Sequence, residues 1–133
     1  MTVTLRSTGR PGYTRNLPCT AESASSARAM VRSALTAWGL HAVADTGALV
    51  VTELVANAAR HTRSHTVRVT VTRPAEASVL ISVVDRSKRP PVSRVADDGD
   101  ESGRGLAIID ALSQRWGTDP LPWGKRVWVE LTC

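Results

Sequence analysis

Apolar residues recur at helical spacing in the stretch Asp45–Thr62, DTGALVVTELVANAARHT, and the rest of the chain is organised around this stretch. Residues three and four positions apart share one side of a helix, so the spacing predicts an amphipathic helix with one buried stripe. Asp45 or Thr46 is expected to cap its start, because a short side-chain oxygen accepts from the unpaired backbone N–H groups there. The stripe consists of Leu49, Val50, Leu54, Val55 and Ala58.

Two further stretches have the same period. Ala21–Trp38 is predicted as an amphipathic helix with Thr20 as its cap and Gly39 as its stop. Leu106–Trp116 is predicted as a shorter helix that ends before Gly117. The residues expected to face inward are Ala27, Met30, Val31, Leu35 and Trp38 in the first helix, and Leu106, Ile109, Leu112 and Trp116 in the second.

Alternation of apolar and polar residues with a period of two predicts strands. Residues 2–6, TVTLR, are expected to form a short first strand. Val67–Thr72 and Val79–Val83 are predicted as a hairpin that turns at residues 73–77, and Arg126–Leu131 as the last strand.

The segments between these elements are predicted as loops. Residues 9–18 are rich in glycine and proline. Residues 86–103, RSKRPPVSRVADDGDESG, have no periodicity and contain two adjacent prolines. A loop of that length is unusual unless it is functional, so we expect a lid over a site, with its acidic residues facing water.

The order of elements predicts an α/β (α+β) two-layer sandwich, with a mixed, largely antiparallel sheet and helices on one face. The length of 133 residues suits a single domain, 1–133, with a core of about residues 20–131. The chain is 42% hydrophobic and 22% charged, which is enough apolar material to bury a core. We expect a cytoplasmic location and no membrane partner, because no apolar run of spanning length and no apolar signal core stand out.

The formal net charge of +5 is compatible with a nucleic-acid partner, an anionic ligand or no specific partner. The arginines are spread along the chain, and aromatic residues make up only 4% of it. A protein that binds single strands would interleave basic and stacking aromatic residues. The two cysteines, Cys19 and Cys133, lie far apart in sequence and are predicted to be two unrelated thiols.

The central helix carries the first candidate site. Glu53 and Asn57 are four residues apart, so both side chains leave one face. A carboxylate and a carboxamide beside an apolar stripe could serve a buried hydrogen-bond network, a metal ion or a phosphate. The structural alternative is a solvated Glu53 and a helix-surface Asn57. In the functional case the amide oxygen suits Mg²⁺, and Glu53 could act as a general base.

Two other stretches could carry chemistry. Asp85 closes a predicted strand, where a carboxylate can accept from the exocyclic amine of a base, although Asp is also common in turns. The run of Gly103, Arg104, Gly105 and Leu106 directly precedes a predicted helix. Glycines allow close backbone approach to phosphate, and a helix N-terminus offers N–H donors, but a simple loop-to-helix junction would have the same sequence.

These stretches, taken in order, resemble one family. ELVANAARH resembles the N box, VVDRSKRPP a degenerate G1 box and ESGRGLAIIDALSQRWG the G2 box of the histidine-kinase-like (GHKL, Bergerat-fold) ATPases. GKRVWVEL is similar to the last strand of the anti-sigma-factor serine/threonine kinases and their actinobacterial relatives. The resemblance covers residues 21–131.

The resemblance implies a Bergerat-type ATP-binding fold, with ATP and Mg²⁺ as ligands, and a role for each site residue. Asn57 would bind Mg²⁺, Glu53 would be the catalytic base, and Asp85 would accept from the adenine amino group. His61 lies in the N box and would join the nucleotide site. Gly103, Arg104, Gly105 and Leu106 would wrap the triphosphate.

The resemblance also implies an activity and partners. Kinases of this branch phosphorylate a serine on an anti-anti-sigma antagonist protein, and they dimerise to hold a sigma factor. It therefore implies a serine/threonine protein kinase that acts as a homodimeric anti-sigma factor, without direct nucleic-acid contact. Two departures stand out: both G1 glycines are replaced after Asp85, and Arg126 stands where a small hydroxyl residue is frequent.

Three hypotheses follow from the sequence. The first is an ATP-dependent serine kinase that acts as an anti-sigma factor. The second is a nucleotide-binding regulatory module without kinase activity that controls a protein partner. The third, a basic nucleic-acid-binding domain, lacks any recognition motif in the sequence.

Overall fold

A computed structural model describes residues 2–5, 11–61, 65–86 and 101–133, with side chains for 12–60, 65–86 and 107–133. Its strands are β1 (Thr2–Leu5), β2 (Pro11–Pro18), β3 (Thr66–Ala75), β4 (Ser78–Asp85), β5 (Arg115–Leu121) and β6 (Gly124–Thr132). Its helices are α1 (Ser23–Ala37), the 3₁₀ turn η1 (His41–Val43), α2 (Ala44–His61) and α3 (Glu101–Leu112).

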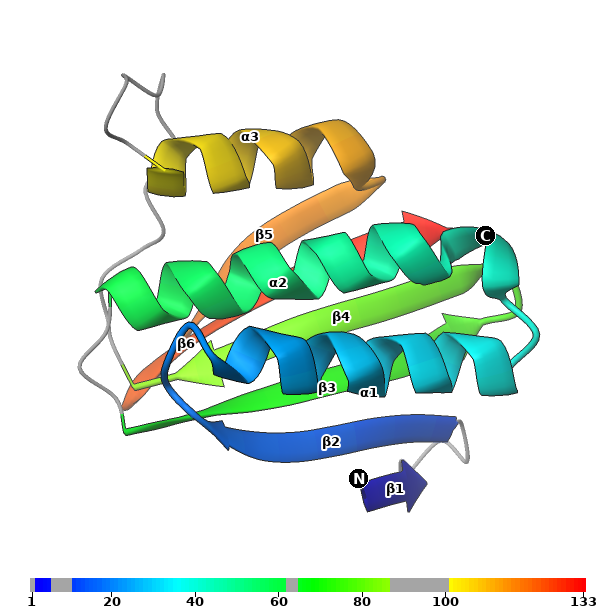
Figure 1. The fold of residues 1–133 in the computed structure, drawn as a ribbon, viewed down its shortest axis with the longest axis horizontal. Helices are drawn as coiled ribbons and strands as arrows, with labels where there is room; N and C mark the ends of the chain where they lie inside the picture. The colour runs from blue at the N-terminus through cyan, green and yellow to red at the C-terminus, as the bar shows by residue number, and fades with distance from the viewer. Residues whose placement is uncertain (1, 6–10, 62–64, 87–100) are drawn as a thin grey trace.

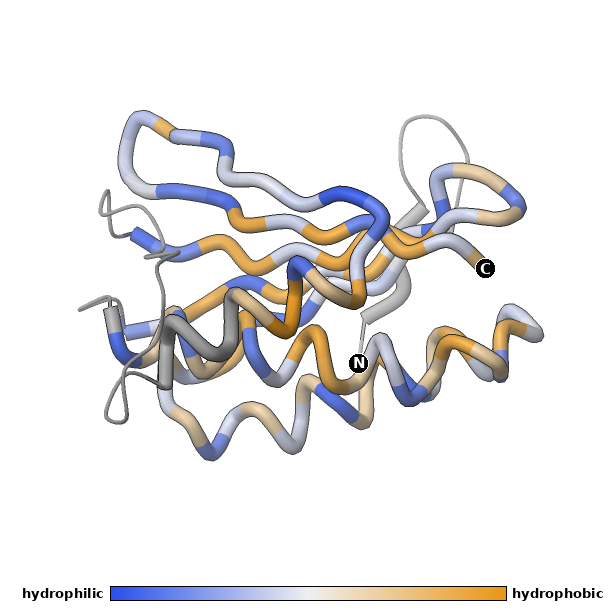
Figure 2. The backbone as a smooth tube through the Cα atoms, turned by 90° about the horizontal axis from the view of Figure 1, so that it is seen from above, coloured by the Kyte–Doolittle hydropathy of each residue, from blue (hydrophilic) through white to orange (hydrophobic). Residues whose placement is uncertain are grey.

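The strands form one six-stranded sheet in the order β1-β2-β3-β4-β6-β5, and every neighbouring pair among them is antiparallel. The helices lie on one face of this sheet (Figure 1). Seen along the sheet, strands and helices form two layers (Figure 2). The predicted two-layer sandwich is therefore confirmed, with an antiparallel sheet in place of the mixed one.

Alternation along the central strands places one apolar row against the helices. In the β4–β6 register, Ile81 lies opposite Val129 and Val83 opposite Val127, and all four side chains are buried. Side chains of directly opposed residues share a face, so this row continues to the last pair of the two strands, Asp85 and Lys125. The apolar row of the sheet comprises Val67, Val69, Val71, Val79, Ile81, Val83, Val127, Val129 and Leu131.

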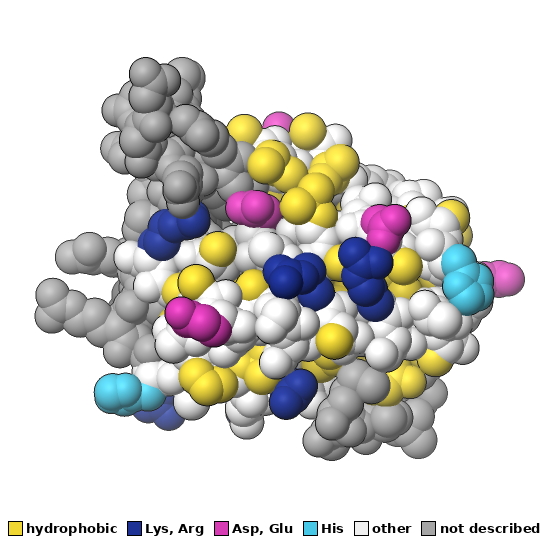
Figure 3. Space-filling view, in the orientation of Figure 1, with side chains coloured by type: hydrophobic (Ala, Val, Ile, Leu, Met, Phe, Trp, Pro, Cys, Tyr) yellow, Lys and Arg dark blue, Asp and Glu magenta, His cyan; other side chains and the backbone are white. Residues whose placement is uncertain are grey.

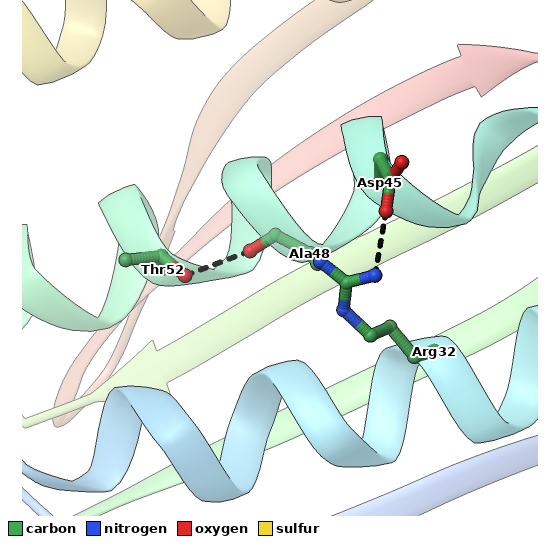
Figure 4. Close-up of polar contacts among 4 residues, drawn as sticks. All are labelled: Arg32, Asp45, Ala48 and Thr52. Carbon is green, nitrogen blue, oxygen red and sulfur yellow. Dashed lines mark hydrogen bonds and ion pairs between the residues drawn. The ribbon is translucent and has the colours of Figure 1, made fainter.

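Helices α1 and α2 pack closely because Gly47 has no side chain. A Cβ atom there would lie 2.8 Å from Leu35 Cδ1 and 3.0 Å from Val31 Cγ1. At the solvent side of this contact, the Arg32 guanidinium donates to the Asp45 carboxylate across 2.5 Å (Figure 4). Within α2 the Thr52 hydroxyl donates to the Ala48 carbonyl at 2.7 Å, as Figure 4 also shows. In addition, Arg28 Nη1 donates to the hydroxyl of Thr52.

Both long helices were predicted nearly to their ends, but their starts differ from the prediction. Helix α1 begins at Ser23, and Thr20 contacts the Ser23 hydroxyl instead of capping the helix. Helix α2 follows η1, so Asp45 lies in its first turn and pairs with Arg32. Gly39 ends α1 as predicted, with a φ of 74° that a side chain would disfavour.

The inward faces were also mostly predicted. Met30, Val31 and Leu35 of α1 are buried, and so are four of the five stripe residues of α2. Leu49 is the exception, because its side chain is 42% exposed. Leu112, predicted to face inward, is 40% exposed at the end of α3.

By length and composition, His41–Arg60 would also be able to cross a membrane, with a mean hydropathy of 1.3. This differs from the sequence-based expectation that no such run exists. In the folded chain the segment includes the core helix α2, whose apolar stripe packs on the sheet.

Three elements differ from the prediction. Residues 11–18 form strand β2, not a loop, with a proline at each end. Helix α3 begins at Glu101 and ends at Leu112, so Gly117 does not end it. Trp116 belongs to the unpredicted strand β5, from which it packs partly buried against the core. The proposed lid over residues 86–103 falls mainly on 87–100, which lie outside the described residues.

Candidate functional site

The candidate residues come from element ends that gather at one edge of the molecule. The end of α2, the end of β4, the start of α3 and the start of β6 all lie at the left of Figure 1. Helix α2 packs against β4, β6 and α3, which holds these ends together. The polar residues of α2 and of the sheet therefore lie at the same end of the two-layer core.

Asn57 is buried on α2, with 6% of its surface exposed. Its Oδ1 atom is buried and accepts no hydrogen bond in the part of the chain that the structure describes. A buried acceptor without a partner costs free energy, so native proteins keep few of them. Glu53, one turn earlier on the same face, is half-buried. Asn57 is thus not the helix-surface residue of the structural alternative.

Asp85 ends β4 and is also buried, with its side chain 1% exposed. Lys125, its direct partner on β6, donates from Nζ to Asp85 Oδ1 across 3.1 Å, and its side chain is 4% exposed. An ion pair this deep survives because each charge satisfies the other, and removing one partner would leave a buried charge. The carboxylate predicted to accept from adenine is therefore already held by an ammonium group of the same chain.

The backbone beside this ion pair is tightly packed. A Cβ atom at Gly124 would lie 2.0 Å from the Asp85 carbonyl oxygen, so only glycine fits there. On the solvent side, the Arg86 guanidinium lies 5.8 Å from the centre of the Trp123 ring, which is half exposed. This distance permits a cation–π contact between the residue after Asp85 and the β5–β6 turn.

Cys19 lies within electrostatic range of the same pair. Burial raises the pKa of the Cys19 thiol, the Asp85 carboxylate raises it further, and the Lys125 ammonium lowers it. Its backbone N–H donates to the His65 carbonyl at 2.9 Å, which continues the β2–β3 pairing one residue beyond Pro18. The thiol is therefore predominantly protonated near neutral pH and a poor nucleophile. Both cysteines are free, as predicted.

The glycine-containing run lies in a helix, not in a loop before it. Gly103, Arg104, Gly105 and Leu106 all belong to α3, which begins at Glu101. Because the unpaired N–H groups of a helix are confined to its first turn, only Gly103 keeps the predicted donor position. His61 is the last residue of α2. The structure does not describe the side chains of His61 and of residues 101–106. The contacts expected of them with a nucleotide therefore remain predictions.

On β6, the family pattern drew attention to Arg126 as a departure and not to its neighbour Lys125. Arg126 lies on the face away from the helices, where its guanidinium is 3.4 Å from the Asp119 carboxylate. The residue that faces the site is Lys125, one position earlier. The alternation along GKRVWVEL could have indicated Lys125, because residues two positions apart in a strand share a face. Lys125 therefore lies on the same face as Val127 and Val129, which are buried.

The remaining charges do not form a continuous surface on the helical side. Figure 3 shows the basic side chains as separate groups along this layer, with apolar side chains gathered over α3. Ion pairs involve Arg32, Arg115 and Arg126. Among the described residues, no three His, Cys, Asp or Glu side chains lie close enough to hold a metal ion by themselves.

The comparisons agree with the motifs. The family model described as "Histidine kinase-like ATPase domain" matches residues 17–130. A solved structure, "The crystal structure of the RsbU and RsbW domains of Rv1364c from Mycobacterium tuberculosis", is similar with a TM-score of 0.68 and 20% identity. The match covers 92% of this chain but only 32% of that one, so the chain spans about a third of its length. No curated protein matches this chain in sequence. Because the family model covers most of the sequence, the chain belongs to the histidine kinase-like ATPase domain family.

Proposed function

We propose that this protein is an ATP-binding regulator that acts as a serine/threonine protein kinase and anti-sigma factor in a cytoplasmic partner-switching system. Its substrate would be a serine on an anti-anti-sigma antagonist protein, and it would hold a sigma factor as a homodimer. The observation that carries the proposal is the orphaned, buried Oδ1 atom of Asn57 within the N box of a family match.

The donor set fits Mg²⁺ with a bound nucleotide. A neutral amide oxygen is a suitable ligand for Mg²⁺, which takes few protein ligands and completes its shell with water and phosphate oxygens. Bound Mg²⁺ would neutralise phosphate charge, and Asn57 would be its protein ligand.

Glu53 would serve the chemical step. Its carboxylate accepts the proton of the attacking serine hydroxyl, as the serine oxygen bonds to the γ-phosphorus and the bond to the ADP oxygen breaks. Its place on α2 suits this role, because it is half-buried and lies one turn from Asn57. The first-turn N–H groups of α3 would donate to phosphate oxygens, and Gly103 lies in that turn.

The test separates binding from transfer. Glu53→Gln should retain Mg²⁺-ATP affinity within about threefold and lose about 10²–10⁴-fold in phosphoryl transfer, the range typical of a positioned base. Asn57→Ala should lose Mg²⁺-dependent binding itself. Calorimetry measures the first quantity, and γ-labelled ATP added to the native cytoplasmic extract measures transfer to protein serine. Equal loss of binding in both variants would contradict this division of roles.

The Asp85–Lys125 ion pair favours a second candidate, a nucleotide-binding regulatory module without kinase activity. A carboxylate already paired with an ammonium is a weaker acceptor for a neutral amine than an unpaired one. Pull-downs with ATP and with ADP distinguish the two functions. A partner captured in a nucleotide-dependent way, without labelled phosphate on any protein, would favour the module over the kinase.

A further inference from the structure

We propose that Lys125 limits how tightly this chain binds the base of ATP, because its ammonium occupies the carboxylate that the base requires. The inference rests on the proposed function, since it assumes that a nucleotide enters the site at the ends of α2 and β4. It assigns a specificity-determining role to Lys125, which lies outside the N, G1 and G2 boxes.

The position of Asp85 leaves the base few ways to reach it. The carboxylate lies in the helix-facing row of the sheet, directly opposite Lys125, and both side chains are almost fully buried. A base amine must either displace the ammonium or share the carboxylate with it. Displacement would break this buried ion pair, which is costly.

Sharing is also unfavourable to the base. The Lys125 charge partly neutralises the carboxylate, and a hydrogen bond to a charged acceptor owes much of its strength to that charge. In the unbound protein the Asp85 carboxylate therefore already accepts a hydrogen bond from Lys125, so the base gains less free energy by binding to it. Removing the ammonium should leave the charge of this acceptor less neutralised, so that a hydrogen bond from the base amine becomes stronger.

The expected effect of removing Lys125 on ATP affinity is opposite to the effect of charge attraction alone. A triphosphate is an anion, so deleting a nearby cation should weaken its binding. We expect instead that Lys125→Met binds Mg²⁺-ATP about tenfold more tightly or better, the value of a hydrogen bond to a charged group. Methionine keeps an unbranched side chain of similar length, so the change removes mainly the charge.

The matched control is Arg126→Met. Arg126 is the next residue of β6, carries the same charge and lies on the opposite face of the sheet, where it pairs with Asp119. Its loss should leave ATP affinity unchanged within about twofold, because this ion pair is partly exposed on the other face of the sheet.

The discriminating probe is purine riboside triphosphate, which has the ATP skeleton but no 6-amino group. Calorimetry on the full chain compares its binding with that of ATP in the wild type, Lys125→Met, Arg126→Met and the double variant Lys125→Met/Asp85→Ala. We expect a gain for ATP that exceeds the gain for the analogue by at least about fivefold, and no gain in the double variant. Should Lys125→Met fail to fold, Lys125→Gln provides the same comparison with a neutral donor.

The outcomes are separable. Wild-type binding of ATP without a gain in Lys125→Met would overturn the inference and leave the proposed function standing. Equal gains for ATP and the analogue would also overturn it, because the effect would not involve the base amine. If neither the wild type nor any variant binds ATP at millimolar concentration, both the proposed function and this inference are wrong.

Discussion

Replacing Asn57 with leucine should make the protein more stable while abolishing its ligand binding. Asn57 is 6% exposed and its Oδ1 accepts no hydrogen bond from the described residues. A buried acceptor in that state costs about 1–3 kcal/mol, and leucine is close to asparagine in shape while carrying no polar atom. Allowing for the loss of other Asn57 contacts, we expect a net gain of about 1 kcal/mol.

A gain of this size is measurable. For a chain of this length, 1 kcal/mol corresponds to a rise in Tm of about 4 °C. Urea unfolding followed by circular dichroism gives the free energy of unfolding, and calorimetry with Mg²⁺-ATP gives the loss of binding. The matched control is Asn16→Leu on β2, where the side chain is exposed and accepts from Arg68 Nε at 3.4 Å. That change should stay within about 0.5 kcal/mol of the wild type.

The result that refutes this reasoning is a clear loss of stability. If Asn57→Leu lowers the free energy of unfolding by more than about 1 kcal/mol, Asn57 contributes to the fold through its polar group. Its amide would then be a structural residue, and the argument for a ligand site at this position would fail. If Asn57→Leu is more stable but still binds Mg²⁺-ATP, only the assignment of Asn57 as a metal ligand is wrong.

Two further predictions concern the surroundings of Asp85. Gly124→Ala should destabilise the fold by about 3 kcal/mol, because its Cβ atom would lie 2.0 Å from the Asp85 carbonyl oxygen. In the control Gly39→Ala the Cβ atom meets no other atom, so this change should cost only about 1 kcal/mol for the positive φ. The urea midpoints of the two variants measure the difference. Cys19, in a chain whose other cysteine is serine, should react more slowly with iodoacetamide at pH 7.5 in Lys125→Met and faster in Asp85→Asn. The reason is that the ammonium lowers the thiol pKa while the carboxylate raises it, and only the thiolate reacts; equal rates in all three chains would contradict the assigned environment.

Periodicity predicted the elements that turn one face toward the core and the other toward solvent. The long helices and the β3–β4 hairpin each present an apolar row to the core, so their sequences show the period directly. Strand β2 has no such clear pattern, because Arg15 and Asn16 are exposed and prolines stand at both ends. Its identity as a strand comes from pairing with β3, which the local sequence does not encode.

The start of α3 was not predicted from the sequence for a different reason. Gly103 and Gly105 are poor helix formers, so local propensity favoured a loop before Leu106. The chain is nevertheless helical from Glu101, and α3 packs on α2. Tertiary contacts decide the state of a segment whose intrinsic preference costs only about 1 kcal/mol per glycine.

Glu53, Asn57 and Asp85 could be named as candidates from the sequence, but the pairing of Asp85 with Lys125 could not. Glu53 and Asn57 belong to one helix, so their spacing alone placed them on one face. Asp85 and Lys125 are 40 residues apart and meet only through the β4–β6 register. That register depends on which strands are neighbours in the sheet, which periodicity along one strand does not reveal.

The two polar centres of this site should therefore respond to mutation with opposite signs. Asn57 is a buried group without a hydrogen-bond partner among the described residues, and removing its polarity relieves a cost. Lys125 is one member of a buried ion pair, and breaking such a pair by removing one partner typically costs about 3–5 kcal/mol. A ligand that supplies a cation to Asn57 and an amine to Asp85 would compensate both deficits. Added Mg²⁺-ATP should thus raise the Tm of Lys125→Met by more than that of the wild type, since a ligand stabilises the folded state in proportion to its affinity for that state.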